Sequence, residues 1–439
     1  MHSTLCSLPP PYQRLASTEG CSREEAVMQR PIRSLLFFAW LQLYGGAAEP
    51  LPSAALPMIH LDSQGTIVSD PGVPCRIRWL TPGAPETSDP SRTHTGLVRF
   101  HGASSQAYPK KSFKVAFDAP VKWLGMRESA HWVLNAAFVD RSLMRHKLSY
   151  DLFRSMSSSN APRYASASRF VEVTLNGKYH GAYLLMERVD RALLGLRKFD
   201  SNATHHACIY KAIDHAANFD RPGHAGYEQR EPDPELREYW GPLDRFNKFV
   251  SSTTDAQFFA PDKGIATRLD LDNAIDFHLL VLVTSNMDGY DKNLMLARDM
   301  PEEGKPLPRF FFVPWDYDAT FGRNWEASRV GTSEWLSNHL LDRLLSHADY
   351  RRRFASRWKE LRAGTLSTER LRETVDENVR TLGDAAQRNA VRWQTLDGPY
   401  PDRLTFEEDI DQMKQWINRR LKWLDAEIER RTAVETPAK

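Results

Sequence analysis

The stretch Phe170-Val-Glu-Val-Thr-Leu175-Asn-Gly-Lys-Tyr-His-Gly181-Ala-Tyr-Leu-Leu-Met186 dictates the structure of the first half of the chain. Its two runs are rich in β-branched, aromatic and other apolar residues, which favour strands. Asn176-Gly177 lies between them, and this dipeptide is typical of a tight turn between antiparallel strands. The stretch therefore predicts a β-hairpin.

Similar short runs precede this hairpin, and clusters of Gly, Pro, Ser and Asp separate them. These runs cover residues 57–61, 75–80, 96–100 and 112–117. Asp140 is a good N-cap for a helix over 141–156, where apolar residues recur at helical spacing. Residues 49–213 are therefore expected to form a mostly antiparallel, β-rich lobe with one long helix.

The pattern changes after this lobe. Residues 214–266 are rich in Asp, Pro, Gly and Arg, which is typical of a linker or insertion. Residues 267–431 are mainly helical in pattern, with one strand pair at 293–297 and 309–313, and 432–439 form a tail. We expect an α+β protein with a β-rich N-lobe, a helical C-lobe and a site between the lobes.

Charge and composition exclude several classes of protein. The 439 residues include 58 Lys and Arg against 56 Asp and Glu, which leaves a net charge of only +2. This balance argues against a nucleic-acid-binding protein. No apolar run reaches the length of about 20 residues that a membrane-spanning helix needs, so an integral membrane protein is not expected.

The N-terminal 48 residues have the features of a secretory leader. Two arginines follow Met28, an apolar core spans 35–41, and small residues at 45–48 precede Glu49. This order is typical of a signal peptide over 28–48, with Met28 as the true start and 1–27 as an extension. A secreted or periplasmic location is expected.

Removal of this leader would leave two cysteines in the chain. They are Cys75 and Cys208, an even pair in an oxidising compartment. Their separation in sequence says nothing about the distance between them, so a disulfide remains an open alternative.

Acidic residues cluster on both sides of the second strand pair. Asp288 and Asn293 precede it at the spacing of the kinase pattern Asp-x-x-x-x-Asn, and Asp316 and Asp318 follow it in a loop ending in Phe-Gly. Carboxylate and amide oxygens suit Mg²⁺ or Mn²⁺ better than zinc. The alternative is that these residues only cap helices and form turns.

A second group lies in Arg99-Phe-His-Gly-Ala-Ser104-Ser105-Gln-Ala-Tyr-Pro-Lys110-Lys111-Ser-Phe-Lys114. Small residues let backbone amides approach phosphate oxygens, and Lys supplies a positive charge. Strand alternation places Lys111 on the apolar side, which makes it a better candidate than Lys110. A solvated strand edge protected by lysines is the alternative.

A third candidate is Glu187, at the end of the apolar strand that closes the hairpin. It could line an adenine pocket or pair with a Lys, or it could simply face solvent. Asp140 and Arg145 are better explained as a helix cap and a helix-face residue than as catalytic groups.

In these motifs the chain resembles the CotH kinase family from about Leu56 to Trp393. The shared motifs include the Arg99 to Ser112 segment, Asn176-Gly-x-Tyr-x-Gly-x-Tyr-x-x-x-Glu187, Asn286-x-Asp288 with Asn293, and Pro314-Trp-Asp-Tyr-Asp318 with Phe321-Gly322. The resemblance implies a divergent, two-lobed protein-kinase-like fold. It also implies a transferase that moves the γ-phosphate of ATP to Ser or Thr of a secreted or surface protein.

The resemblance assigns a role to each candidate residue. Asp288 is expected to be the catalytic Asp that deprotonates the acceptor hydroxyl. Asn293 and Asp316, with Asp318 as a further ligand, are expected to hold Mg²⁺ or Mn²⁺. The residues expected to bind ATP are Lys111 or Lys110, Arg99, Ser104, Ser105 and Glu187.

Two alternatives stay open. The chain could be a catalytically inactive CotH-like surface, adhesion or binding protein. It could also transfer AMP or phosphate to a non-protein acceptor.

Overall fold

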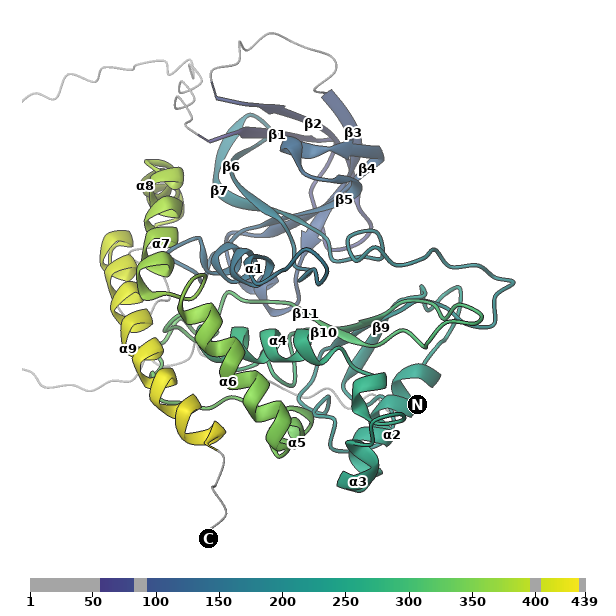
Figure 1. The fold of residues 1–439 in the computed structure, drawn as a ribbon. Helices are drawn as coiled ribbons and strands as arrows, with labels where there is room; N and C mark the ends of the chain where they lie inside the picture. Colours follow the sequence, from purple (N-terminus) through teal and green to yellow (C-terminus); the bar gives the residue numbers. More distant parts are fainter. Residues whose placement is uncertain (1–55, 83–92, 395–403, 434–439) are drawn as a thin grey trace, which may run out of the picture. The chain divides into compact units, whose positions relative to one another are not determined.

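The first half of the chain forms a closed barrel of seven strands in the computed structural model, which describes residues 56–82, 93–394 and 404–433 (Figure 1). The barrel strands are β1 (Met58–Ser63), β2 (Val73–Leu80), β3 (Thr93–His101), β4 (Ser112–Lys122), β5 (Glu128–Asn135), β6 (Ser168–Leu175) and β7 (Lys178–Glu187). Short 3-10 helices η2 (Ser104–Ala107) and η3 (Trp123–Gly125) lie between them.

The β6–β7 hairpin has the predicted structure. The two strands pair antiparallel on either side of Asn176 and Gly177, which both take positive φ angles, 50° and 74°. Such angles suit a tight hairpin turn because they match the twist of the flanking strands. The hairpin prediction is therefore confirmed.

Closure of the barrel depends on one parallel strand pair. The strand order is β1-β2-β3-β4-β5-β7-β6, and β1 returns to β6 with Met58 opposite Glu172. Alternate side chains such as Val98, Val115 and Trp132 point inward and are fully buried. A closed barrel leaves no strand edge open for unwanted pairing.

A second, four-stranded sheet lies among the helices, in the order β11-β10-β8-β9. Its strands are β8 (Cys208–Ala212), β9 (Tyr227–Glu231), β10 (Leu294–Arg298) and β11 (Phe311–Pro314). The helices are α1 (Arg145–Ser155), α2 (Gly241–Ser252), α3 (Asp255–Phe258), η4 (Ile265–Thr267), α4 (Leu271–Thr284), α5 (His339–Leu345), α6 (Ala348–Arg362), α7 (Thr368–Leu382), α8 (Ala385–Trp393) and α9 (Phe406–Thr432).

Helix α4 forms the centre of the helical part. Nearly all of its residues are buried, and it packs against β11, α1, α6 and α9. Its N-cap Asp270 accepts hydrogen bonds from the backbone of Asp272 and Asn273, as N-cap residues do. A helix that is buried on nearly all sides needs such a surrounding shell.

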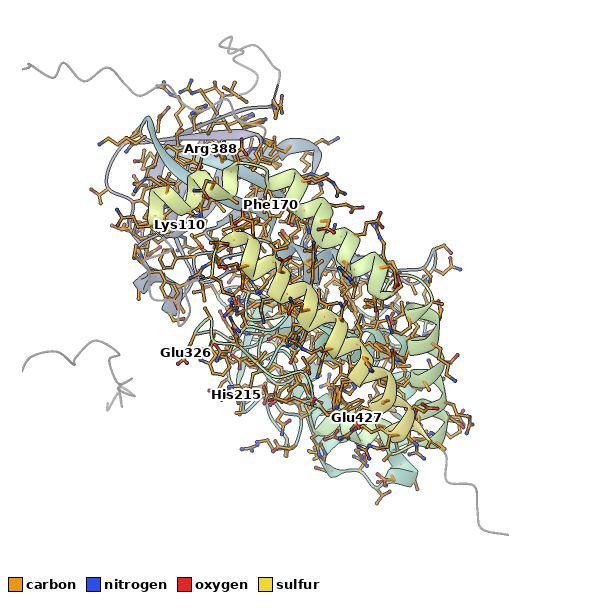
Figure 2. All side chains as sticks on the ribbon, turned by 90° about the vertical axis from the view of Figure 1, so that its left-hand side faces the viewer. Lys110, Phe170, His215, Glu326, Arg388 and Glu427 are labelled. Carbon is orange, nitrogen blue, oxygen red and sulfur yellow. The ribbon has the colours of Figure 1, made fainter. Side chains whose placement is uncertain are left out.

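Helix α8 binds the barrel through an ion pair. Arg388, labelled in Figure 2, donates to both carboxylate oxygens of Glu172 on β6 at 2.9 and 2.8 Å. Tyr179 donates its hydroxyl to the same carboxylate at 2.6 Å. Glu172 is fully buried, so these bonds compensate its lost hydration.

The predicted two-lobed, kinase-like fold is wrong, although the α+β class is right. The β-rich half is a closed seven-stranded barrel, not an antiparallel lobe of the kinase type, because β1 and β6 pair in parallel. This pairing joins residues more than 100 positions apart, and strand patterns carry no signal of it. Residues 214–266, predicted as a linker or insertion, contain β9, α2 and α3.

Both described cysteines are free and buried. Cys75 lies in the barrel core and Cys208 in the core of the helical part, so they form no disulfide. The leader predicted at 28–48 lies outside the described residues. Of the helices in the described ranges, none combines the length and hydrophobicity needed to cross a membrane.

Candidate active site

The loop of residues 315–323, here called the acid loop, follows β11 and carries Asp316 and Asp318. Asp316 has a φ of 57°, which few residues other than Gly, Asn and Asp adopt. Its N–H donates to the Tyr150 hydroxyl at 3.0 Å, and its carbonyl accepts from Asn286 Nδ2 at 3.1 Å. These two bonds hold the strained backbone, while the Asp316 side chain remains 49% exposed.

The two carboxylates of the acid loop have opposite pKa shifts. Partial desolvation by the surrounding protein opposes ionisation of Asp316, but His146 Nε2, 3.4 Å from its carboxylate, outweighs this effect and lowers the pKa of Asp316. Burial and the charge of Asp316 raise the pKa of Asp318 to about 6. Two carboxylates that disfavour each other's charge form a site that a cation would stabilise.

The acid loop fits a magnesium-type ion better than zinc. No group of three or more His, Cys, Asp or Glu side chains within residues 56–82, 93–394 and 404–433 is arranged to hold a metal by itself. Mg²⁺ commonly uses one or two carboxylates and takes its other ligands from water and substrate phosphates. Asp316 and Asp318 meet that requirement.

Asp288 lies in the turn that follows α4, and its side chain is 19% exposed. Lys292 Nζ approaches its carboxylate to 3.6 Å and His215 Nε2 to 3.9 Å. The other nitrogen of His215 lies 2.9 Å from Asp291 Oδ1. Asp288 is therefore accessible and flanked by two basic groups.

The β10–β11 pairing brings the two acidic segments together. Leu294 pairs with Pro314, which places Asn293 beside the start of the acid loop. The Trp315 N–H donates to the Asn293 carbonyl at 3.1 Å. Asn293 also has a positive φ, 47°, so the predicted ligands on both sides of the hairpin have unusual backbones.

Basic residues from the barrel and the second sheet gather next to these acids. We call Lys114, Arg188, Lys211 and Arg230 the cation cluster. Burial and then the charges of Arg188, Arg99 and Arg230 lower the pKa of Lys114 to about 8. Lys114, Arg188 and Lys211 are half-buried, and none has an ion-pair partner among the described residues.

One ring contact and one electrostatic effect connect the cation cluster to the acid loop. Lys211 Nζ lies 5.0 Å from the centre of the Trp315 ring. Burial and the charge of Lys114 lower the pKa of His101 to about 4, whereas the charge of Asp316 acts in the opposite direction. The charges of both Lys114 and Asp316 therefore act on the His101 ring. Unpaired, half-buried cations next to acids form a natural site for a phosphate-bound metal.

Ser104 and Ser105 belong to η2 in the loop between β3 and β4. Tyr108 directly follows η2, and burial and the charges of Asp318 and Glu326 raise its pKa. Arg99, on β3, pairs with Asp70 at 2.8 Å and contributes its charge to Lys114.

Lys110 and Lys111 hold backbone rather than acids. Lys110 is fully buried and donates to the carbonyls of Ala136 and Ala182 and to Asn389 Oδ1. Lys111 Nζ donates to the carbonyls of Gln106 and Tyr108, both at 2.5 Å. Their predicted role in binding ATP is untested by these contacts.

Glu187 is buried at the end of β7. Its carboxylate lies 3.5 Å from Arg127 Nε and accepts from the Ala167 N–H at 3.1 Å. Its partner is an arginine, whereas the sequence suggested a lysine, an adenine ring or solvent. Of the predicted residues, the structure brings Asn293, Asp316 and Asp318 together, with Asp288 nearby. Lys110 and Glu187 instead bond to other parts of the chain.

A model of the CotH kinase protein family matches residues 98–424. This match covers the β3–β4 loop, the acid loop and most of α9. The chain belongs to the CotH kinase protein family. It is also 28% identical over 343 residues to the inner spore coat protein H of Bacillus subtilis (strain 168), which covers 74% of this chain and 85% of the relative.

Several residues around the acids of this CotH family member were not predicted from the sequence. They are His101, His146, Arg188, Lys211, His215 and Arg230. Lys114 lies in the lysine-rich segment, from which only Lys110 and Lys111 were predicted as lysines that bind phosphate. Arg188 directly follows Glu187 of the family motif, and this neighbouring position is the one feature of the sequence that could have identified it. His146 lies on α1 and Lys211 on β8. Both elements are distant from the acid loop in sequence and approach it only in the folded chain.

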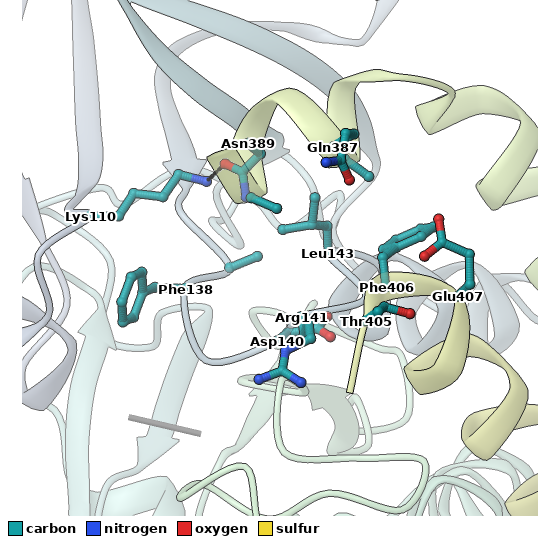
Figure 3. Close-up of a pocket in the computed structure, with 13 residues that line it drawn as sticks. Lys110, Phe138, Asp140, Arg141, Leu143, Gln387, Asn389, Thr405, Phe406 and Glu407 are labelled. Carbon is teal, nitrogen blue, oxygen red and sulfur yellow. Dashed lines mark hydrogen bonds between the residues drawn. The ribbon is translucent and has the colours of Figure 1, made fainter. Parts of the chain in front are cut away.

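A cavity of about 190 Å³ lies outside this group of acids and cations (Figure 3). It lies between the 137–143 segment, α8 and the first turn of α9, and Lys110 reaches its edge. None of Asp288, Asn293, Asp316 or Asp318 lines it. The candidate active site of this CotH family member is therefore distinct from this cavity.

Proposed function

We propose that this CotH family member is a kinase that transfers the γ-phosphate of ATP to Ser or Thr of a protein, with Mg²⁺ or Mn²⁺. One observation carries the proposal: the cation cluster, of which Lys114, Arg188 and Lys211 have no ion-pair partner among the described residues, lies next to a pair of mutually repelling carboxylates. A nucleotide triphosphate with its metal has the charges that complement both groups. The family name supports the same chemistry.

Each residue then has a role that follows from its charge. Lys114, Arg188 and Lys211 would neutralise phosphate oxygens, with Arg230 at the exposed rim. Asp288 would accept the proton of the acceptor hydroxyl. The hydroxyl oxygen would form a bond to the γ-phosphorus as the bond between that phosphorus and ADP breaks. The side chains of Asn293, Asp316 and Asp318 would hold the metal.

A bound divalent cation would supply charge neutralisation along the phosphates. His146 would orient the Asp316 carboxylate, since its Nε2 lies 3.4 Å from it. Ser104 and Ser105 lie on the same loop as Tyr108, whose pKa the charge of Asp318 raises, so their backbone could cover the phosphates. The proposed role of Lys111 is to hold this loop through two carbonyls rather than to bind phosphate.

The direct test is label transfer by the purified chain from γ-labelled ATP with Mn²⁺ to casein or to itself. We expect label on Ser or Thr, and a loss of at least 100-fold in Asp316→Asn and Asp288→Asn. Asp262→Asn, an exposed carboxylate on the α3–η4 connection, is the matched control and should label normally. Equal labelling by Asp316→Asn would refute the proposal.

The same experiment separates the alternatives. An inactive surface or adhesion protein would give no label and no stabilisation by ATP with metal. Transfer of AMP would give label from α-labelled ATP instead.

The cation cluster makes a specific prediction about ATP. Lys114→Ala should raise the KM for ATP about 10- to 100-fold, because a hydrogen bond to a charged group contributes about 1.5–3 kcal/mol. The pKa of Lys114 is about 8, so ATP affinity should weaken as pH rises from 7 to 9 in the wild type only. Lys122→Ala, exposed on the same strand, is the control. An unchanged KM in Lys114→Ala would contradict this role.

The relative from Bacillus subtilis is named as a spore coat protein. Together with the leader expected at 28–48, this supports a location outside the cytoplasm and an acceptor protein on a secreted or surface structure. Detection of the chain in fractionated cells and culture medium tests the location.

A further inference from the structure

A buried network of four charged side chains connects the acid loop to the C-terminal helix α9. Its members are Asp140, Arg145, Arg323 and Asp409, and all four are buried. Such a network is costly to desolvate, and each charge therefore depends strongly on its partners.

Arg145 joins three segments of the chain. Its Nη1 donates to Asp409 Oδ2 at 3.0 Å and also to Asp140 Oδ1. Its Nε donates to the carbonyl of Thr320, inside the acid loop, at 3.0 Å. The first turn of α1 is thus bonded to the acid loop two residues after Asp318.

Arg323 reaches the same carboxylate from the end of the acid loop. Its Nε and Nη2 donate to Asp409 Oδ1 at 3.0 and 2.7 Å. Asp409 therefore receives one arginine bonded to the middle of the acid loop and one that belongs to the loop itself. Figure 3 shows the first turn of α9 at Thr405 beside the segment that carries Asp140 and Arg141.

Helix α9 makes further contacts with the same region. Trp416 Nε1 donates to the carbonyls of Val330 and Gly331 at 3.2 and 3.0 Å. Gly322 has a φ of 94°, and a Cβ there would lie 2.9 Å from the Trp416 ring. The end of the acid loop is therefore shaped to fit α9.

We propose that Asp409 is a positioning residue that sets the geometry of the acid loop through Arg145 and Arg323. The inference rests on the proposed function only in treating the acid loop as a metal site. The bonds from Asp409 to the two arginines do not depend on that function. Asp409 touches none of the proposed ligands. It acts by holding the acid loop at Thr320, through Arg145, and at Arg323, both of which follow Asp318 in the loop.

The chain contains a matched control for this proposal. Asp276, on α4, is a fully buried carboxylate that also binds two arginines, Arg163 at 2.6 Å and Arg357 at 2.7 Å. Its bonds do not reach the acid loop. Asp409→Asn and Asp276→Asn therefore remove the same charge from similar surroundings.

The first measurement is hydrogen exchange of the full chain without metal or nucleotide. Asp409→Asn should speed exchange in peptides covering 315–331 at least tenfold, including the Phe321 N–H that donates to Thr284. Asp276→Asn should leave these peptides unchanged. Equal effects of both variants, or no effect of Asp409→Asn, would overturn the proposal. Arg323→Lys provides a second variant if Asp409→Asn does not fold.

The second measurement is the Kd for Mn²⁺, obtained from the electron paramagnetic resonance signal of the free ion. The Kd should rise about tenfold in Asp409→Asn and stay within about twofold in Asp276→Asn. A wild-type chain that transfers no phosphate or binds no Mn²⁺ would refute the proposed function, and hydrogen exchange would still decide the role of Asp409. If the wild-type chain binds Mn²⁺ and Asp409→Asn binds it with the same Kd, the proposed role of Asp409 would be overturned.

Discussion

Burial and the charge of Asp316 raise the pKa of Asp318 to about 6, above the ordinary value of 3.8. The protonated form of Asp318 therefore favours the folded state. This contribution to stability is complete below pH 4 and is lost as pH rises through about 6. Asp318 thus carries a cost at neutral pH that a bound cation would remove.

A single substitution tests this reading of Asp318. Asp318→Asn should increase the free energy of unfolding by about 1–3 kcal/mol at pH 8 and change it little at pH 4. Urea unfolding at both pH values, without metal, measures the difference. Asp262→Asn should have no effect at either pH, and an equal effect of Asp318→Asn at both values would contradict the assignment.

Among the elements, the attachment of α8 to the barrel explains why Lys110 is buried. Its ammonium holds two barrel carbonyls and Asn389 of α8, and Asn389 Oδ1 also accepts from the Ala182 N–H at 3.2 Å. Burial lowers the pKa of Lys110 well below its ordinary value. These contacts favour a role in stability, whereas the sequence predicted a role in binding ATP.

Lys110→Met separates these two roles. The substitution removes the ammonium donor from the buried carbonyls of Ala136 and Ala182 and leaves Asn389 Oδ1 with the Ala182 N–H alone, so we expect a loss of about 2–4 kcal/mol of stability. The KM for ATP of the folded variant should stay within about twofold of the wild-type value. Lys122→Met, at an exposed position at the end of β4, should change neither quantity. A large rise in KM for ATP in Lys110→Met would instead support the sequence-based prediction.

At the scale of the whole molecule, one buried and two half-buried histidines predict sensitivity to acid. Burial is the main cause that lowers the pKa of His101, His180 and His278 to about 4 in each case. The unfolded chain therefore binds more protons than the folded chain between about pH 6.5 and 4. Stability should fall as pH falls through this range.

His278→Gln provides the test, because Gln can replace the donation from Nε2 to the Leu336 carbonyl. The loss of unfolding free energy from pH 7 to pH 5 should be smaller in this variant by about 1–2 kcal/mol. Urea unfolding at the two pH values measures it. The exposed His205→Gln should keep the wild-type difference, and an unchanged difference in His278→Gln would contradict the prediction.

The sequence by itself determined the local structure and the chemistry available to this protein. The Asn176-Gly177 turn, the α+β class and the acidic positions on either side of the second hairpin all depend on nearest neighbours in the chain. Strand alternation and turn preferences are local properties, which is why they can be read from residue order. The motifs that define the family are likewise contiguous.

Only the tertiary structure decided how these parts meet. The parallel pairing of β1 with β6 closes the barrel and overturns the expected two-lobed fold. The cation cluster takes Lys114 from β4, Arg188 from the end of β7, and Lys211 and Arg230 from the second sheet. Such groups lie far apart in sequence and come together through packing of apolar surfaces, which is not specific to any charged residue. Lys114 therefore differs from Lys110 by its surroundings in the folded chain, not by any feature of its sequence.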